Sequence, residues 1–393
     1  MLSIIPKSID QQSSAAALSR QSRLTKPTGA LGDLEDIAVT LAGHQGRECP
    51  RIENPEIFVF AADHGVAAQG VSAYPQSVTA QMVHNFLGGG AAVSVLATLH
   101  GARLTVVDMG VVGLQVPEHS AFLSRTCNTK GTRDFTRGPA MTHNELQHAL
   151  AAGHECVILA LSRGCDIFIA GEMGIGNTTA ASAIACALLG KPAAELVGLG
   201  TGITNQTRLH KCAIVDKALL LHTQTFARPQ NESIDPGVAP NQTSSHSPAQ
   251  SAVAEPTDCG GFLHPEQALE ALRCLGGYEI AAMTGAALAC AQQGLTFLVD
   301  GFIVSVAALV AAVLQPGARD WMLFAHQSAE AGHNAVLDAL DAHALLKLDM
   351  RLGEGSGAAL ALPILKAACA LHGGMATFAQ AGVDDRASGD STA

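Results

Sequence analysis

Six apolar runs of strand length recur along the middle of the chain, and a helical pattern separates most of them. Polar and apolar positions do not alternate within these runs, which is typical of strands buried on both faces. Continuous apolar strands joined by helices predict an α/β fold, a parallel sheet of roughly six strands with helices on both faces in a Rossmann-like arrangement. The predicted strands are Ile57–Ala61, Leu104–Val107, Asp166–Ala170, Leu196–Leu199, Thr296–Val299 and Trp321–Ala325.

Both ends of the chain show helical periodicity instead. Two helices are predicted near the start, over Ser13–Thr25 and Leu31–Gly43, with a turn rich in Pro and Gly between them. A last helix, predicted over Ala358–Leu371, precedes a polar tail that we expect to be frayed. We expect N-terminal helices of a small helical domain in 1–50, an α/β domain in 51–330, and C-terminal helices with an active-site loop at 349–357 in 331–393.

One stretch of the α/β segment, residues 228–261, has a different composition. It is rich in Pro, Ser, Gln and Asn and has almost no large apolar residues. Such a stretch cannot bury enough surface to order itself. It predicts a disordered surface insertion without a functional role.

A second stretch, Leu295–Leu314, is apolar enough to raise the question of a membrane span. It carries Asp300 in its interior and has no basic residues at its flanks, and a carboxylate inside a membrane is costly. We predict a strand followed by a buried helix over Phe302–Leu314, and no membrane span.

Composition narrows the class of protein. Hydrophobic residues make up 48% of the chain and charged residues 15%, which indicates a well-filled interior, and the net charge of −11 argues against nucleic acid as a partner. The ten cysteines and sixteen histidines show neither CxxC nor HExxH spacing, so we expect reduced thiols and no metal site. The N-terminus lacks an apolar export signal, which favours a cytoplasmic location.

Residues directly after each predicted strand form the first candidate site, because ligands bind at the carboxyl ends of parallel strands. Nearly every one of these positions has a glycine beside a polar residue. They are Asp63-His64-Gly65, Asp108-Met109-Gly110, Gly171-Glu172, Gly200-Thr201-Gly202, Asp300-Gly301 and His326-Gln327-Ser328.

The strongest of these signals lies in Cys165–Gly190, which reads as a strand, a glycine loop and an Ala-rich helix. A helix that begins after glycines directs free N–H groups and its positive dipole end at the loop, which suits a phosphate monoester. The loop matches neither a Walker A motif nor GxGxxG, so nucleoside triphosphates and dinucleotides are disfavoured. The alternative is a turn without a ligand, but Glu172 argues against it, because a carboxylate beside an anion site is costly unless it faces another part of the ligand.

A second glycine loop, GEGSG, contains Glu354 at the start of the last predicted helix. A carboxylate there could simply favour the helix N-terminus. It could also act as a general base, since burial would raise its pKa towards neutrality. A third stretch, residues 70–82, follows the first strand and holds Tyr74 and Met82, which suit a flat heterocycle. Its other reading is a helix start with Pro75 in the first turn.

Together these motifs resemble the nicotinate-nucleotide–dimethylbenzimidazole phosphoribosyltransferase family of cobalamin lower-ligand assembly. The resemblance runs from about Leu24 to Leu371, and only the 228–261 insertion looks foreign to it. The matching segments are AADHGV (61–66), YPQSVTAQMV (74–83), GEMGIGNTT (171–179), LGTGI (199–203), LVDGFIVSVAALVA (298–311), HQSAEAGH (326–333) and RLGEGSGAALA (351–361).

The resemblance implies transfer of phosphoribose from nicotinate mononucleotide to 5,6-dimethylbenzimidazole, giving α-ribazole 5′-phosphate and nicotinate without a cofactor or metal. It implies a homodimer with a small helical domain built from both chain ends. Glu354 becomes the catalytic base, and the base pocket falls on Tyr74, Ser77 and Leu352, with a further position near Asn85 whose register is open. The implied nucleotide contacts are Glu172, Gly174, Gly176, Asn177, Gly200, Thr201, Lys211 and Ser328.

Two alternatives compete with this interpretation. A phosphoribosyltransferase that uses phosphoribosyl pyrophosphate would need an acidic pair followed by a Thr/Gly-rich phosphate loop and magnesium, and the sequence lacks that arrangement. A non-enzymatic domain that binds a phosphorylated metabolite would keep the phosphate loop and have no need of Glu354.

Overall fold

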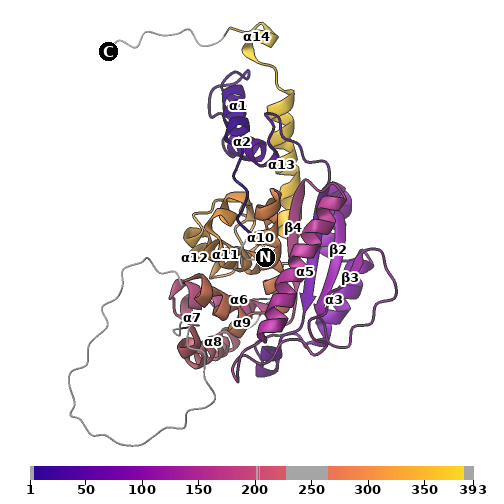
Figure 1. The fold of residues 1–393 in the computed structure, drawn as a ribbon, viewed down its shortest axis with the longest axis vertical. Helices are drawn as coiled ribbons and strands as arrows, with labels where there is room; N and C mark the ends of the chain where they lie inside the picture. The colour runs from indigo at the N-terminus through magenta and orange to yellow at the C-terminus, as the bar shows by residue number, and fades with distance from the viewer. Residues whose placement is uncertain (1–3, 201, 203, 227–263, 385–393) are drawn as a thin grey trace, which may run out of the picture.

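The sheet at the centre of the molecule has seven strands, all parallel, in the order β3-β2-β1-β4-β5-β6-β7 (Figure 1). The computed structural model describes residues 4–200, 202, 204–226 and 264–384. Chain order runs outward in both directions from the neighbouring strands β1 and β4, so the topological switch point lies between them. The strands are β1 Pro55–Ala62, β2 Arg103–Gly110, β3 Phe122–Ser124, β4 Ile167–Met173, β5 Thr296–Val299, β6 Met322–His326 and β7 Ala344–Leu346.

The predicted α/β class with a parallel sheet is confirmed, and five of the six predicted strands lie in it. The strand predicted at Leu196–Leu199 is wrong. Leu196 ends the short helix α7 (Ala193–Leu196), which packs on the helices α6 and α8 and not in the sheet. A short buried apolar run has the same composition in either setting, so periodicity cannot separate them.

The two strands that the pattern did not predict, β3 and β7, close the edges of the sheet. Each has three residues, and none of those residues is fully buried. Such short edge strands leave too few positions for an apolar run to stand out.

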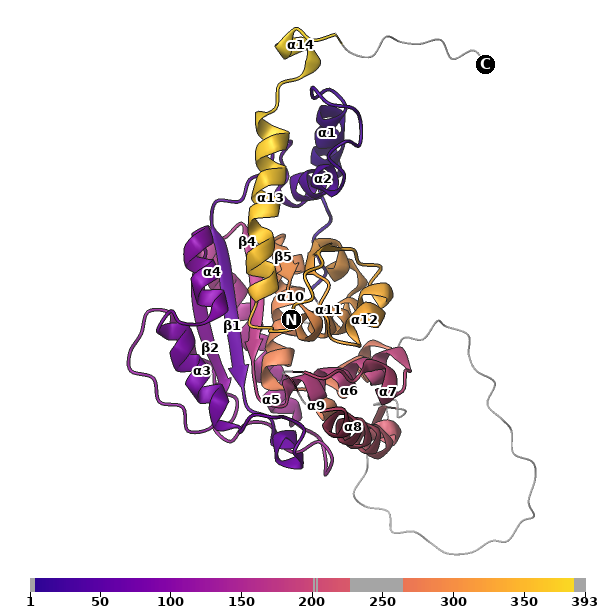
Figure 2. The same ribbon diagram turned by 180° about the vertical axis from the view of Figure 1, so that it is seen from behind.

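Helices cover both faces of the sheet, as Figures 1 and 2 show. On one face α10 (Tyr278–Gln293) lies against the central strands, and α5 (His143–Ser162) and α11 (Phe302–Leu314) pack on α10. On the other face lie α3 (Ser77–Leu87), α4 (Ala92–His100) and α13 (Ser356–Gly374). The remaining helical elements are η1 Gly65–Gln69, α6 Asn177–Leu189, α8 Asn205–Phe226, α9 Pro265–Leu275, η2 Pro316–Trp321, α12 His333–Ala339 and α14 Phe378–Ala381.

The strands under α10 are held by a row of aromatic rings. Phe58, Phe168 and Phe297 come from β1, β4 and β5, and their ring centroids lie 5.0 and 6.0 Å apart in stacked orientation. All three rings are fully buried. The row fixes the strands whose carboxyl ends carry most of the residues described below.

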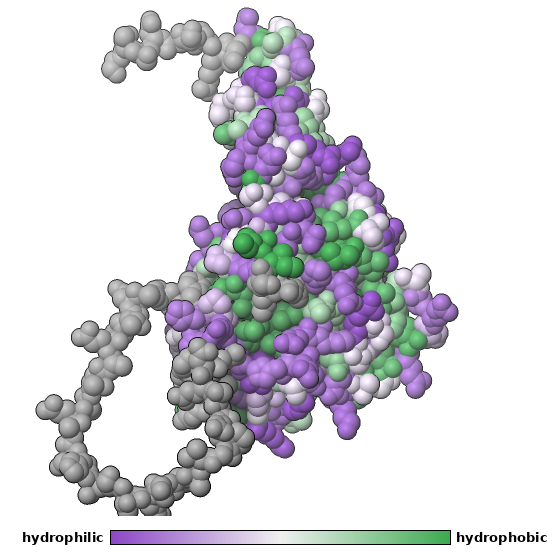
Figure 3. All heavy atoms as spheres, viewed as in Figure 1, coloured by the Kyte–Doolittle hydropathy of each residue, from purple (hydrophilic) through white to green (hydrophobic). Residues whose placement is uncertain are grey.

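A small helical unit at one end of the molecule combines both ends of the chain (Figure 2). Helices α1 (Gln11–Gln21) and α2 (Asp33–Gln45) pack together, and α2 packs on α13. The Arg20 guanidinium donates to the carbonyl oxygens of His372, Gly373 and Met375 at 2.7, 3.0 and 3.2 Å, which satisfies the C-terminal end of α13. On the face shown in Figure 3 hydrophobic residues gather near the middle of the molecule, while hydrophilic residues cover much of this unit.

The predicted terminal helices are confirmed with ends shifted by a few residues. The predicted insertion at 228–261 lies outside the described residues, as does the last part of the predicted tail.

The apolar stretch Leu295–Leu314 forms β5 and the buried helix α11, as predicted. Two other segments of the described chain, Ser77–His100 and Ser356–Gly374, are long and apolar enough to cross a membrane by length and composition alone. The first is divided into α3 and α4 around a run of three glycines, and the second is α13, which packs on α2, α4 and β6.

Candidate active site

A cavity of about 670 Å³ opens at the carboxyl edge of the sheet, beside the switch point between β1 and β4. Residues that follow β4, β5 and β6 line it directly, and the segment after β1 closes one side. The loop at 349–354, which leads into α13, crosses its mouth.

Glu354 reaches this cavity on an unusual backbone. Its φ is +68°, a backbone conformation that residues other than glycine rarely adopt. The backbone of its loop lies flat against β4, because a Cβ on Gly171 would stand 2.1 Å from the carbonyl oxygen of Glu354. Strain of this kind persists only where the surroundings fix it, and it is commonest at functional sites.

The buried carboxylate of Asp300, directly after β5, holds this loop in place. It accepts hydrogen bonds from the N–H groups of Gly355 (3.2 Å) and Ala358 (2.8 Å). Asp300, which follows β5, thereby caps the N-terminus of α13. Burial raises the pKa of Asp300, and His326, whose Nε2 lies 3.8 Å from Asp300 Oδ1, lowers it.

The Glu354 carboxyl group has the properties of a base that works near neutral pH. It is 6% exposed, and its Oε2 has no hydrogen-bond partner among the described residues. Burial raises its pKa to about 7, with a smaller effect from the charge of Asp300, while the Val93 N–H at the start of α4 works in the opposite direction. A carboxyl group with this pKa is half ionised near pH 7 and can both take and return a proton.

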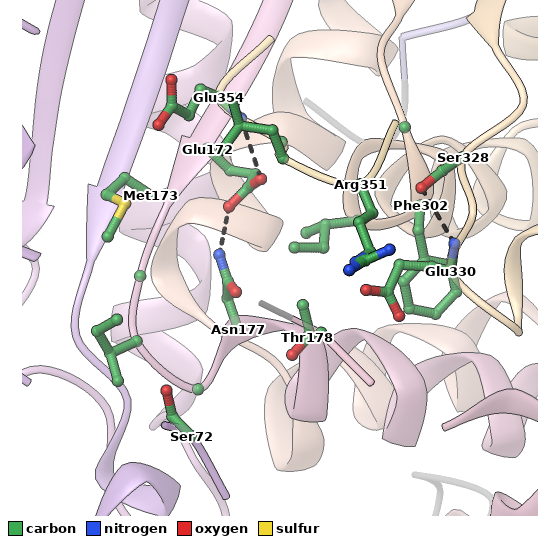
Figure 4. A pocket seen from close by; sticks show the side chains of 18 of the residues that line it. Ser72, Glu172, Met173, Asn177, Thr178, Phe302, Ser328, Glu330, Arg351 and Glu354 are labelled. Carbon is green, nitrogen blue, oxygen red and sulfur yellow. Dashed lines mark hydrogen bonds between the residues drawn. The ribbon is translucent and has the colours of Figure 1, made fainter. Parts of the chain in front are cut away.

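Glu172, at the end of β4, lies between the two halves of the cavity (Figure 4). Its pKa is raised well above the usual range, first by burial and then by the charges of Asp300 and Glu279. One of its oxygens accepts from the Asn177 side-chain amide and the other from the Glu354 N–H at 3.3 Å. The raised pKa favours the protonated form of Glu172, which adds no charge beside an anion.

One half of the cavity carries the cations. The Nζ of Lys211 is buried and donates to Thr178 Oγ1 at 2.7 Å, and burial lowers the pKa of this lysine to about 8. Glu330 lies in the same half, accepts from the Gly200 N–H and opposes that lowering of the Lys211 pKa. Arg351 points into this half beside Glu330 and Thr178 (Figure 4). A phosphate fits here, where a lysine, an arginine and a hydroxyl converge.

The other half is mostly apolar. Figure 4 shows Met173 and Ser72 on the Glu354 side, away from Arg351 and Glu330. The further apolar or aromatic residues lining the cavity include Val71, Tyr74, Val78, Met82, Ile175 and Leu352. Flat apolar walls beside a single unpaired carboxyl oxygen suit an aromatic heterocycle that carries one acidic N–H.

Most of the predicted site residues line this one cavity. Tyr74 and Leu352 are half-exposed at its mouth. The lining residues among those predictions are Tyr74, Glu172, Gly174, Gly176, Asn177, Gly200, Lys211, Ser328, Leu352 and Glu354.

The remaining predicted residues are not placed there. Ser77 is exposed at the start of α3 and is not among the lining residues, and neither is Asn85. Thr201 lies outside the described residues. Of the strand ends named from the sequence, Asp63, His64 and Asp108 do not reach the cavity; His64 instead lies behind the 174–176 loop and pairs with the buried Glu279 at 2.7 Å.

The predicted phosphate loop is also less open than the pattern indicated. The N–H groups of Asn177 and Thr179 already donate to the carbonyl oxygens of Gly174 and Gly176. The cationic half of the cavity lies beyond this loop, at Lys211 and Arg351.

Sequence reasoning missed Glu330, Arg351, Met173 and Phe302 as lining residues. Glu330 and Arg351 lie inside the segments HQSAEAGH (326–333) and RLGEGSG (351–357), so their place in those segments was the available signal. No group of three or more His, Cys, Asp and Glu side chains in the described part of the chain is arranged to hold a metal ion.

The sequence and the fold are also similar to those of known proteins. The sequence model of a family described as phosphoribosyltransferase matches residues 6–235 and 251–383. The chain is 50% identical over 378 residues to the nicotinate-nucleotide–dimethylbenzimidazole phosphoribosyltransferase of a Pseudomonas putida strain, covering 96% of each chain. It is 51% identical over 383 residues to the enzyme of the same name from Pseudomonas fluorescens, covering 97% of each. The crystal structure of CobT from Thermus thermophilus superposes with a TM-score of 0.81 at 41% identity, covering 96% of this chain and 100% of that one.

The raised pKa of Glu354 predicts an effect on stability. The folded state holds the proton until about pH 7, whereas an unfolded glutamate loses it near pH 4.5. The contribution of this protonation to the free energy of unfolding is therefore complete below pH 4.5 and is lost as the pH rises through 7. We expect Glu354→Gln to be more stable than the wild type at pH 8, by up to about 3 kcal/mol, with the difference vanishing near pH 4.5.

Thermal or urea unfolding at pH 5 and pH 8 measures this difference. Glu118→Gln, at an exposed position, is the matched control and should show no such pH-dependent gain. Equal stabilities of wild type and Glu354→Gln at pH 8 would contradict the burial of an ionised Glu354.

Proposed function

Because the chain belongs to the phosphoribosyltransferase family whose sequence model matches it, we propose that it transfers phosphoribose from nicotinate mononucleotide to 5,6-dimethylbenzimidazole. The products are α-ribazole 5′-phosphate and nicotinate, in the assembly of the cobalamin nucleotide loop. The observation that carries the assignment of the chemistry is Glu354, buried at the cavity and held on a strained backbone with a pKa of about 7.

The two halves of the cavity support an arrangement of the two substrates. The phosphate of the nucleotide lies against Lys211, Arg351 and Gly200 in the cationic half. The benzimidazole lies among the apolar residues beside Glu354. This arrangement leaves the ribose near Glu172 and Asn177, whose hydrogen bond divides the cavity.

The chemistry needs one base. The pyridinium of nicotinate mononucleotide leaves as a neutral pyridine ring, so its departure needs no proton donor, and the ribose passes through an oxocarbenium-like state. As the benzimidazole nitrogen bonds to C1′, the N–H on its other ring nitrogen becomes acidic. Glu354 takes this proton while it is ionised, and attack on the face opposite to nicotinate gives the α anomer.

The alternative function, binding of a phosphorylated metabolite without turnover, needs only the cationic half. It gives no reason for a carboxyl group held on strained backbone with an unpartnered oxygen in the apolar half. The deciding experiment mixes the protein with nicotinate mononucleotide and 5,6-dimethylbenzimidazole without added magnesium and follows nicotinate by chromatography. Release of nicotinate that depends on the benzimidazole supports the transferase, and binding without release supports the alternative.

Replacing Glu354 with Gln tests the base directly. The variant keeps the size and polarity of the side chain and removes its basicity. We expect turnover to fall by about a hundredfold or more, the usual contribution of a positioned base, with the affinity for both substrates retained. Single-turnover rates and equilibrium binding on one preparation measure both quantities. A folded variant that turns over at nearly the wild-type rate would show that Glu354 is not the base.

Replacing Lys211 with Met tests the position of the phosphate. The change removes the buried ammonium group and keeps much of the side-chain length. We expect the Kd of nicotinate mononucleotide to rise about tenfold or more, the order of a lost charge-assisted contact, while that of nicotinate riboside, which has no phosphate, changes little. Lys191→Met, at an exposed lysine, is the control. Equal losses for both ligands would argue against a phosphate at Lys211.

We also propose that the protein is a homodimer. Val95 and Leu99 lie one turn apart on α4 and are 56% and 70% exposed, and Ile364 is exposed on the neighbouring helix α13. Exposed apolar residues on adjacent helices favour a second copy as their cover. Light scattering should give twice the mass of one chain, and Leu99→Glu should lower it. A wild-type mass of one chain would exclude the dimer.

A cytoplasmic location is likewise our proposal. The nine cysteines of the described residues are all free thiols, as expected in a reducing compartment. Fractionation of the producing cells tests it, and recovery with exported proteins would contradict it.

A further inference from the structure

Thr79 lies behind the apolar half of the cavity. It sits on α3, between the lining residues Val78 and Met82, and is fully buried. Its hydroxyl oxygen accepts a hydrogen bond from the N–H of Ile175 at 3.2 Å. Ile175 is the middle residue of the 174–176 loop that leads into α6. This bond therefore joins α3, a wall of the apolar half, to the loop that carries Asn177.

The same hydroxyl lies close to Asp63, directly after β1, and interacts with its carboxyl group. Asp63 is 1% exposed, and its Oδ2 accepts from the Val112 N–H at 2.8 Å. Hydrogen bonding from Thr79 lowers the pKa of Asp63, which burial raises. The Thr79 hydroxyl therefore bonds to the loop and also interacts with the residue that follows β1.

The loop has little freedom to move independently of this contact. A Cβ on Gly174 would stand 2.3 Å from the carbonyl oxygen of Ala62, and one on Gly176 would stand 3.3 Å from His64 Cβ. The loop therefore packs closely on the end of β1, and α3 is joined to both by one side chain. A shift of α3 towards a ligand in the apolar half must move the loop or break the Thr79 bonds.

We propose that Thr79 is a positioning residue that couples the two substrate sites, so that occupation of one half of the cavity raises the affinity of the other. This inference rests on the proposed function for the identity of the two ligands. Coupling of this kind is a free energy shared by two sites, and it is reciprocal at equilibrium. Hydrogen bonds through one hydroxyl between two elements are a physical route for it.

Equilibrium binding tests the coupling without turnover. The Kd of 5,6-dimethylbenzimidazole is measured by calorimetry in the absence and in the presence of saturating ribose 5-phosphate, an unreactive substitute for the nucleotide. We expect ribose 5-phosphate to tighten binding to the wild type by about fivefold or more. In Thr79→Val, which keeps the shape and removes the hydroxyl, we expect this enhancement to fall close to onefold.

Three further variants separate coupling from simple stability. Thr79→Ser keeps the hydroxyl and should retain most of the enhancement. Thr284→Val removes a hydroxyl that is equally buried in α10, is bonded to Ile280 and Ala307 and does not line the cavity, and this variant should retain the enhancement fully. Asp63→Asn removes one acceptor of the Thr79 proton and should reduce the enhancement, which keeps the test available if Thr79→Val does not fold.

The proposal is overturned if ribose 5-phosphate leaves the wild-type affinity unchanged. It is also overturned if folded Thr79→Val keeps the wild-type enhancement, or if Thr79→Ser loses it as fully as Thr79→Val. Failure of the proposed function is measured by a different experiment, the nicotinate-release assay. A wild-type protein that releases no nicotinate contradicts the proposed function, whatever the binding experiment shows.

Discussion

The site depends on one buried carboxylate, Asp300, which caps a helix that belongs to a distant part of the chain. By accepting the N–H groups of Gly355 and Ala358, it fixes where α13 begins. Glu354 lies two residues before that start and is thereby kept at a φ of +68° against β4. Without that acceptor the first turn of α13 would leave its N–H groups unpaired, and nothing would hold Glu354 in a conformation that costs about 1–2 kcal/mol.

Three carboxyl groups, Glu172, Asp300 and Glu354, share this small volume, and the fold gives each a different role. Burial raises the pKa of Asp300, while His326 and the backbone donors of the loop work in the opposite direction. Glu172 is buried beside other acids, which favours its neutral form. Burial raises the pKa of Glu354 to about 7. Groups of one chemical type thus have different surroundings: Asp300 holds the loop, Glu172 accepts from Asn177 and from the Glu354 N–H, and Glu354 is the proposed base. Desolvation of these three carboxyl groups and the repulsion between them are unfavourable for folding stability. Such a loss of stability is common at functional sites.

Glu354 could be identified as a candidate from the sequence because glycines on both sides mark a loop that can approach a ligand closely. The five longer strands could be predicted because buried parallel strands are continuously apolar. The strand predicted at Leu196–Leu199 was wrong because a helix packed between other helices is as apolar as a buried strand. Glu330 and Arg351 lie inside matching segments, but nothing in those segments marks them as neighbours in space. Their side chains meet only because β6 and the loop before α13 are brought together by the sheet, which is a tertiary effect without a local pattern. Ser77 shows the converse: a residue inside a matching motif that lies on the outer side of its helix.

The attachment of α13 at both ends has a consequence for when the site is completed during synthesis. Its first turn is held by Asp300, and its last carbonyl groups are held by Arg20, more than 350 positions earlier in the chain. β1, β4 and β5 can pair before α13 has left the ribosome, but the loop that carries Glu354 has no cap to bind until residues 355–358 are free. The sheet can therefore assemble first, and Glu354 reaches its place last, when α13 packs back against the N-terminal helices.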